Sequence, residues 1–154
     1  MTRSSTPHDE RATATRGDPP PQSLIAGRGA RATRTRVQTL GVLLAAHEAL
    51  THHEIERRVK RGHDVDRVTL YRVLEWLVEQ GLAHKIAGED RVWRYSAAGH
   101  GSAASGAHAH FQCSDCGRVV CLDEASVPAV SLPRGFRRRE IEVTVRGSCD
   151  DCGK

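Results

Sequence analysis

Residues 66–96 read DRVTLYRVLEWLVEQGLAHKIAGEDRVWRYS, and this stretch decides the fold. Its first half places apolar side chains at the spacing of one helical face. We expect a helix that begins near Asp66 and ends at Gly81, because glycine readily adopts the conformation that closes a helix. Two short runs, 82–86 and 91–96, then flank the turn sequence Ala-Gly-Glu-Asp, which predicts a β-hairpin.

Two further helices are expected before this stretch. The first begins near Thr33, and the second has Thr51 as its N-cap, Glu54 as its capping-box partner and Gly62 at its end. Three short helices followed by a hairpin are the plan of a winged helix, whose third helix enters the DNA major groove. We therefore assign a DNA-binding domain to residues 31–96.

The positive charge of the chain is concentrated at its N-terminus. The 154 residues suffice for one ordinary domain or two small ones, which excludes a large multidomain enzyme. The net charge is +4, and residues 1–36 account for all of it, with seven arginines against three acids. Such a segment attracts polyanions. Because Pro19-Pro20-Pro21 opposes a helix, we expect residues 1–30 to be a disordered basic arm.

The sequence predicts a cytoplasmic protein with no membrane partner. No apolar run approaches the ~20 residues that span a bilayer. The segment that follows Met1 lacks the apolar core of a secretion signal. In the cytoplasm, the five cysteines are expected to be thiols or metal ligands rather than disulfides.

A second domain is expected after a small-residue segment at 97–107, which we interpret as a hinge. Strands are predicted at 108–113, 118–122 and 140–146. This C-terminal domain, residues 108–154, is short of apolar core, so it needs a staple or an oligomeric partner. The predicted fold class is thus α+β, with a winged helix and a small C-terminal α/β domain.

Two cysteine knuckles provide the staple. The motifs are Cys113-Ser-Asp-Cys116-Gly and Cys149-Asp-Asp-Cys152-Gly. Each knuckle can hold two thiolates about 3.7 Å apart around one ion, and four thiolates suit tetrahedral Zn²⁺. We predict a closed structural zinc site, which leaves no open position for catalysis, rather than a redox or iron–sulfur centre.

A second group of candidate ligands surrounds the hinge. His108 and His110 are two residues apart on a predicted strand, so both imidazoles project from one face. Cys121 lies on the next strand, His84 in the hairpin and His100 in the hinge. One ion bound by such a set would hold the DNA-binding domain at a fixed angle, which is a metal-operated switch. Taken singly, each of these residues is more often a plain surface or half-buried side chain.

Three motifs in this order resemble those of the ferric-uptake-regulator family of bacterial metal-dependent repressors. TRTRV at 33–37 resembles the first-helix signature, and VTLYRVL at 68–74 resembles the recognition-helix signature. HAHFQCSDCG at 108–117 resembles the metal-binding signature. The resemblance covers residues 33–153. It implies a homodimer whose winged helix binds an AT-rich palindrome and whose C-terminal domain dimerises.

The resemblance also implies DNA contacts. Tyr71 and Arg72 fall on the family's DNA-contacting positions, and Thr69 and Arg36 belong to the same two signatures. A tyrosine ring can pack on a thymine methyl group, and an arginine can bind guanine or phosphate. The alternative for Tyr71 is partial packing in the core of its domain.

Departures from the family pattern bear on the metal and on the dimer. Arg94 stands where many members have an acidic or cysteine ligand, and the positions of a second regulatory site are occupied by Ala107, Ala109 and Ile141. His84 is similar to a ligand in the wing of the zinc-uptake-regulator branch. Prolines between 124 and 136 imply that the long helix of the dimer domain is short or broken.

We therefore predict a zinc sensor. A thiolate among imidazoles favours Zn²⁺ over Fe²⁺ or Mn²⁺. The predicted regulatory ligands are His84, His108, His110 and Cys121, with His100 as the substitute. A second zinc ion per chain would bind there, and the zinc-loaded homodimer would bind operators and repress genes for zinc import.

Three other functions remain as alternatives. Within the family, the protein could sense iron or peroxide. A zinc hydrolase or deaminase is disfavoured, because Gln112 rather than proline precedes the first knuckle and the second knuckle fills the ligand positions that catalysis needs. We therefore expect no enzyme activity and no small-molecule substrate. A zinc-stapled adaptor that binds protein would leave the winged-helix plan and the basic arm unexplained.

Overall fold

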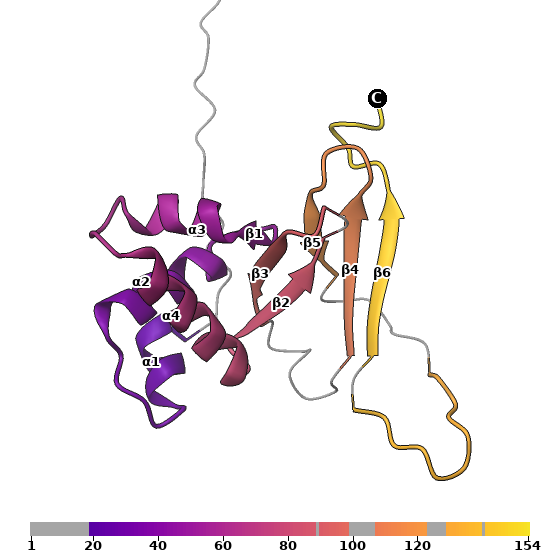
Figure 1. The fold of residues 1–154 in the computed structure, drawn as a ribbon, viewed down its shortest axis with the longest axis horizontal. Helices are drawn as coiled ribbons and strands as arrows, with labels where there is room; N and C mark the ends of the chain where they lie inside the picture. The colour runs from indigo at the N-terminus through magenta and orange to yellow at the C-terminus, as the bar shows by residue number, and fades with distance from the viewer. Residues whose placement is uncertain (1–18, 89, 99–106, 123–128, 140) are drawn as a thin grey trace, which may run out of the picture.

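A computed structural model describes residues 19–88, 90–98, 107–122, 129–139 and 141–154. It shows a helical N-terminal domain that includes a small sheet, beside a C-terminal domain built on a second sheet (Figure 1). This confirms the predicted α+β class with a winged helix followed by a smaller domain. No helix within the described ranges is both long and apolar enough to cross a membrane.

Three helices form the frame of the N-terminal domain, and each begins at a side-chain cap. The helices are α2 (Arg34–Leu44), α3 (His52–Val59) and α4 (Arg67–Glu79). The caps are Thr33, Thr51 and Asp66, whose side chains accept hydrogen bonds from backbone N–H groups three residues further on. Thr51 and Glu54 form the predicted capping box. The apolar faces of the helices, including Leu40, Leu70 and Leu74, are fully buried in one core.

An additional helix, α1 (Pro21–Ala26), lies in the segment expected to be disordered, so that expectation is wrong here. Pro21 occupies the first helical position, where its missing N–H is not needed. Ile25 is fully buried in the core of the domain. This burial supplies the tertiary support that an isolated six-residue helix lacks. Residues 1–18 of the expected arm lie outside the described residues.

The hairpin is present and is joined by one strand that was not predicted. The strands β2 (Ala83–Ala87) and β3 (Trp93–Ala97) are antiparallel, close to their predicted positions. The two-residue strand β1 (Leu50–Thr51) pairs with the other edge of β3, which gives the order β1-β3-β2. Helices and hairpin together form a winged helix.

The C-terminal sheet has the order β5-β4-β6. Its strands are β4 (Ala107–Cys113), β5 (Val119–Cys121) and β6 (Ile141–Gly147). β4 pairs antiparallel with β5 and parallel with β6. Residues 129–139 contain neither helix nor strand, in keeping with the expected interruption of the dimer-domain helix. The hinge residues 99–106 lie outside the described part of the chain.

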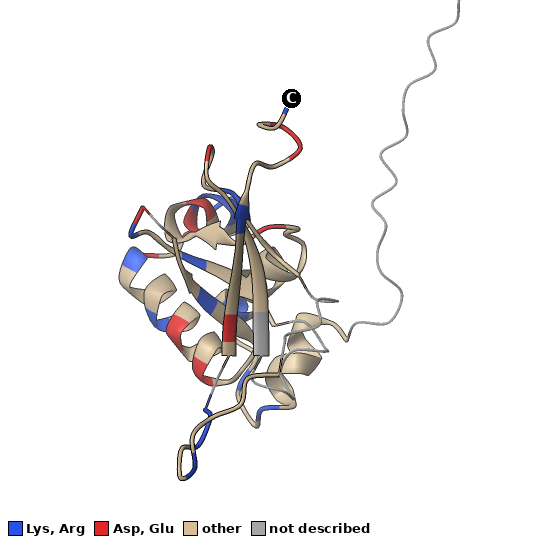
Figure 2. Cartoon of the chain, turned by 90° about the vertical axis from the view of Figure 1, so that its right-hand side faces the viewer, with Lys and Arg blue, Asp and Glu red and all other residues tan. Residues whose placement is uncertain are grey.

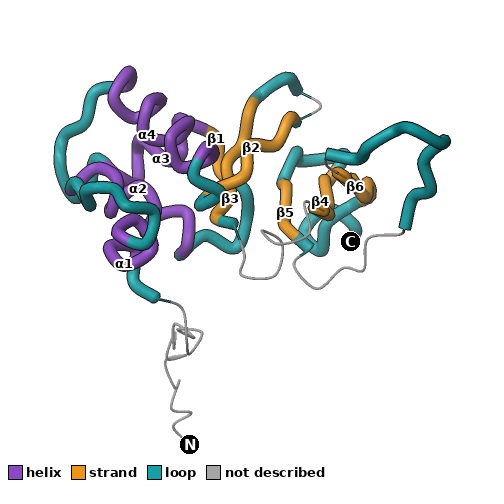
Figure 3. The backbone as a smooth tube through the Cα atoms, turned by 90° about the horizontal axis from the view of Figure 1, so that it is seen from below, coloured by secondary structure: helices purple, strands orange, loops and turns teal. Residues whose placement is uncertain are grey.

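The two domains are in contact through β5 (Figure 3). The Ala49 N–H donates a hydrogen bond of 2.8 Å to the Val119 carbonyl. Ala49, Ile86 and Val119 form a small buried cluster, and Cys121 packs against it. The hairpin and the second sheet therefore share one junction, and the candidate ligands His84 and Cys121 come from its two sides.

Candidate metal centres and nucleic-acid interface

The two cysteine knuckles leave the same end of two neighbouring strands. Cys113 is the last residue of β4 and pairs with Gly147, the last residue of β6, in parallel register. The Ser114 N–H donates to the Gly147 carbonyl at 2.9 Å. Cys149 therefore begins its knuckle beside Cys113, although the two are 36 positions apart in the sequence.

The sulfur geometry fits a zinc ion. All four Sγ atoms lie within 4.8 Å of one another, and those of Cys116 and Cys149 are 3.7 Å apart. Tetrahedral Zn²⁺ with Zn–S bonds of about 2.3 Å requires sulfurs about 3.8 Å apart. In both knuckles the glycine after the second cysteine donates its N–H to the carbonyl of the first. Gly117 has a φ of +74°, a conformation that favours glycine.

Hydrogen bonds within the cluster favour one thiolate over the others. The backbone N–H groups of Cys116 and Cys149 lower the pKa of Cys113 to about 6. Hydrogen bonds with the thiols of Cys149 and Cys116 raise the pKa of Cys152 to about 12. Four thiolates at this separation repel one another, so full ionisation requires a cation among them.

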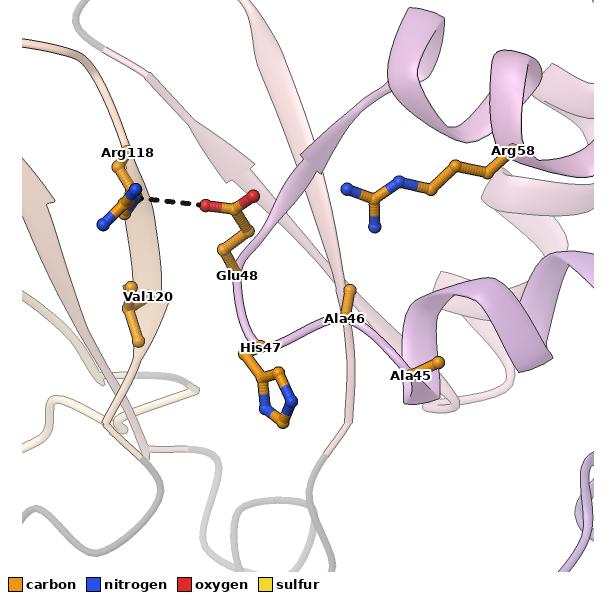
Figure 4. A pocket seen from close by; sticks show the side chains of 7 residues that line it. All are labelled: Ala45, Ala46, His47, Glu48, Arg58, Arg118 and Val120. Carbon is orange, nitrogen blue, oxygen red and sulfur yellow. Dashed lines mark ion pairs between the residues drawn. The ribbon is translucent and has the colours of Figure 1, made fainter. Parts of the chain in front are cut away.

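Arg118 connects the cluster to both domains. Its guanidinium forms ion pairs in the second knuckle with Asp151 at 2.8 Å and Asp150 at 3.4 Å. It also pairs with Glu48 of the N-terminal domain at 3.3 Å, beside a cavity of about 380 Å³ that Arg58 also lines (Figure 4). Partly exposed pairs of this kind each stabilise little, but here three of them converge on one side chain.

Three of the candidate regulatory ligands, His84, His110 and Cys121, lie on strands near the domain junction. Cys121 in β5 lies opposite His110 in β4. The Cys121 thiol donates to the Ser96 hydroxyl at 3.1 Å, and Ser96 in β3 lies opposite His84 in β2. Because directly opposed residues in an antiparallel pair share a face of the sheet, His110 accompanies Cys121 and His84 accompanies Ser96. Ser96 carried no sequence signal as part of this group.

The ligand atoms of His84, His110 and Cys121 do not form a compact cluster in this structure. Among the described residues, three or more such atoms come within 4.8 Å of one another only in the four-cysteine cluster and in the overlapping group Cys149, Asp150 and Asp151. His110 is buried, whereas His84 and Cys121 are partly exposed. His100 and the side chain of His108 lie outside the described part. The regulatory set therefore stays a prediction.

Arg94 on β3 holds the turn of the hairpin through an ion pair with Asp90. Its side chain is buried and donates two hydrogen bonds to Asp90, of 2.9 and 2.8 Å. These bonds raise the pKa of Arg94 and lower the pKa of Asp90 to about 2. A buried guanidinium repels a metal cation, so Arg94 cannot replace the ligand that many family members have at this position.

The exposed face of α4 carries most of the predicted DNA contacts. Thr69, Tyr71 and Arg72 are exposed, and Tyr71 retains 46% exposure. Figure 2 shows that α4 is basic in its first half and acidic toward its end. The turn of the hairpin lies on the same side of the molecule as α4 (Figure 3). Helix and wing can therefore approach one duplex together.

Two side chains beside α4 are held by aromatic contacts. The Arg36 guanidinium lies 3.9 Å from the centre of the Trp76 ring and donates to the Arg31 carbonyl at 3.1 Å. The His52 ring stacks on Tyr71 with their centres 3.7 Å apart and their planes at 17°. Sequence reasoning assigned no role to His52, because its ring partner lies on another helix, 19 positions further along the chain. A winged helix with an exposed helix face, joined to a second domain that carries a four-cysteine cluster, is the arrangement expected of a metal-dependent DNA-binding protein.

Comparisons with known proteins agree with this class. The sequence model of the ferric uptake regulator family matches residues 27–144. A ferric uptake regulation protein of Bacillus subtilis is 31% identical over 126 residues, covering 78% of this chain and 83% of that protein. A zinc uptake regulation protein of Mycobacterium tuberculosis is 28% identical over 137 residues, covering 80% of this chain and 95% of that protein.

Solved structures share the fold. A zinc uptake regulator complexed with zinc and DNA has a TM-score of 0.62 at 20% identity, covering 84% of this chain and 88% of that chain. The chain belongs to the ferric uptake regulator family. It is therefore a metal-responsive transcriptional regulator, and members of this family are regulators rather than enzymes.

Proposed function

We propose that the protein is a zinc-responsive repressor of zinc-uptake genes, which acts in the cytoplasm and binds palindromic operators as a metal-loaded homodimer. The contact of Cys121 with Ser96 carries the proposal, because it places a thiol at the seam between the two domains. The resemblance to the zinc uptake regulation protein of Mycobacterium tuberculosis supports the choice of metal. Thiolate and imidazole together favour Zn²⁺.

The four knuckle cysteines would hold a structural zinc ion, and His84, His108, His110 and Cys121 would form the regulatory site. Bound at the second site, zinc would supply a cross-link between the hairpin and the C-terminal sheet. His84 comes from the hairpin and His110 from β4, so ligation by both would reduce the relative motion of the domains. A domain held at one angle binds DNA without a prior orientation cost.

The proposed operator contacts are made by the exposed first half of α4. Thr69, Tyr71 and Arg72 would meet base edges and phosphates in the major groove, and Arg36 would add a phosphate contact. Exposed apolar side chains of the C-terminal domain, among them Phe136 and Val145, support a homodimer because a second copy would cover them. A symmetric dimer would present two recognition helices, one to each half-site of a palindrome.

Metal counting together with DNA titration tests the proposal. We expect two zinc ions per chain and affinity for DNA that rises as the second ion binds. Replacement of both His108 and His110 by alanine should abolish the zinc response while one zinc ion remains bound. One zinc ion per chain, with DNA binding raised by anaerobic Fe²⁺ instead, would overturn the zinc assignment.

Iron sensing is the second candidate, supported by the identity of 31% with the ferric uptake regulation protein of Bacillus subtilis. The same titration separates the two, because only the metal that fills the regulatory site raises affinity. A chain that fails to bind duplex DNA at low salt with any metal would instead favour the protein-binding adaptor, since phosphate contacts are strongest at low salt.

A further inference from the structure

His52 and Tyr71 form a stacked pair across the two helices of the DNA-binding face. Tyr71 lies on α4 one turn after Arg67, and it is the partner that retains access to solvent. His52 is the first residue of α3 and is 9% exposed. The ring centres are 3.7 Å apart and the planes are inclined by 17°, so one face of the tyrosine ring is covered by the imidazole.

The backbone that carries His52 is held firmly. It follows Thr51, whose side chain closes the capping box of α3 and whose backbone pairs with Arg94 of β3. The Thr51 N–H donates to the Glu54 carboxylate at 2.8 Å. A residue between a paired strand and a capped helix has little freedom in its φ and ψ angles, which makes His52 a firm support.

The imidazole also lies close to a carboxylate of its own helix. Glu56, one turn further along α3, places a carboxylate oxygen 4.0 Å from the His52 Nδ1 atom. The same carboxylate pairs with Lys60 at 2.9 Å and with Arg67, the first residue of α4, at 3.7 Å. Glu56 therefore links the start of α4 to the helix that carries His52, and the ring of His52 approaches Glu56 and stacks on Tyr71.

We propose that His52 is a positioning residue for operator recognition, which holds the ring of Tyr71 in the orientation that reads DNA. This inference rests on the proposed function of Tyr71 as a base-contacting residue. An exposed tyrosine on a helix samples several rotamers, and freezing one of them on binding weakens affinity. The stack with His52 selects the rotamer before DNA arrives, so the complex forms with less ordering.

The experiment uses the full zinc-loaded chain and a duplex enriched by the wild-type protein from a random-sequence pool. Affinity is measured for that duplex and for a scrambled duplex of the same composition. We expect His52→Ala to weaken binding of the enriched duplex by roughly fivefold to tenfold, the size of one frozen side chain, and to leave the scrambled duplex unchanged. His52→Phe keeps a ring that can stack and should restore affinity.

Two controls separate positioning from general structure. His53→Ala changes the neighbouring exposed histidine on the same helix and should alter affinity less than twofold. In a chain that already carries Tyr71→Ala, the further change His52→Ala should have no effect, because no ring remains to be positioned. Thermal unfolding and the zinc count confirm that each variant folds.

The outcomes are distinguishable. If His52→Ala binds like the wild type, or weakens both duplexes equally, or weakens binding equally when Tyr71 is absent, the positioning role is wrong while the proposed function stands. If the wild-type protein enriches no duplex in the presence of any metal, the proposed function fails and this inference fails with it.

Discussion

The Cys121 thiol donates a hydrogen bond of 3.1 Å to the Ser96 hydroxyl. Cys121 lies on β5 of the C-terminal sheet, and Ser96 lies on β3 of the winged helix. This contact places a potential thiolate ligand between the two domains. On the proposed function, Cys121→Ala should lose at least tenfold of the zinc-induced gain in DNA affinity, measured by fluorescence anisotropy. One zinc ion per chain should remain in the four-cysteine cluster.

Ser96→Ala is the matched control for that experiment, because it removes the same hydrogen bond and leaves the thiol. It should keep two zinc ions and most of the zinc response. If Ser96→Ala and Cys121→Ala reduce the zinc-induced gain in DNA affinity equally, the hydrogen bond between them, rather than metal ligation by Cys121, supports the zinc response at the domain junction.

Cys113→Ser is expected to disrupt the C-terminal domain rather than the switch. The Cys113 sulfur is buried and accepts the backbone N–H of Cys149, so its loss breaks both the cluster and the link between β4 and β6. Structural zinc contributes about 10–16 kcal/mol to small zinc domains, which equals or exceeds the net stability of a typical domain. Hydrogen exchange should show lost protection in β4 and β6 with α2 and α4 still protected. Full protection of both strands would contradict a structural role for the cluster.

Arg118 and Glu48 offer a test of the ion pair between the domains. Arg118→Ala should favour separated domains by up to about fivefold, since a partly exposed ion pair contributes about 0.2–1 kcal/mol. Small-angle X-ray scattering should show a larger radius of gyration, and Glu48→Gln should give the same change. Asp150→Asn is the control, because Asp150 pairs with Arg118 within one domain. Scattering that is unchanged in Arg118→Ala would mean that other contacts hold the junction.

Stability should decrease on acidification through His52. Burial lowers the pKa of His52 from its ordinary value of 6.5, and the positive charges of Arg67 and His53 lower it further. The Glu56 carboxylate and a backbone hydrogen bond with Arg67 oppose this shift without cancelling it. The unfolded chain therefore binds this proton at a higher pH than the folded chain. Its contribution to stability is fully present above pH 6.5 and is lost as the pH falls below that value.

His52→Phe removes this titration and keeps a ring against Tyr71. The difference in melting temperature between wild type and variant should change as the pH falls from 7.5 to about 5, with the wild type losing more. A constant difference over that range would show that His52 titrates alike in the folded and unfolded states.

Arg36 is expected to act in both stability and DNA binding. Its guanidinium stacks on Trp76, and loss of such a contact costs about 0.5–1 kcal/mol. Arg36→Ala should therefore lower the melting temperature and change the tryptophan fluorescence. On the proposed function it should also reduce the salt dependence of DNA binding by about 0.9 in the log–log slope.

The exposed Arg72 provides the comparison for Arg36. Arg72→Ala should weaken DNA binding with little change in stability, because its side chain lies in solvent. A salt slope that stays the same in Arg36→Ala would remove Arg36 from the DNA interface and leave it a structural residue.

The sequence by itself determined the helices, the hairpin and the two knuckles, because each is encoded by neighbouring residues. Thr51 and Glu54 form a capping box within one turn, and the left-handed φ of Gly81 ends the region of α4 as expected. The spacing of two residues within each knuckle likewise depends only on local turn geometry. Caps and turns of this kind depend on neighbouring residues, so they form independently of how the rest of the chain packs.

Tertiary structure alone decided the helix α1, the strand β1 and the side-chain pairs between separate elements. Pro21 reads locally as a helix breaker, yet burial of Ile25 stabilises the turn that follows it. The stack of His52 on Tyr71 and the contact of Cys121 with Ser96 join residues far apart in the chain. Packing of whole elements sets such contacts, and no local pattern of residue types encodes the relative placement of two helices or two sheets.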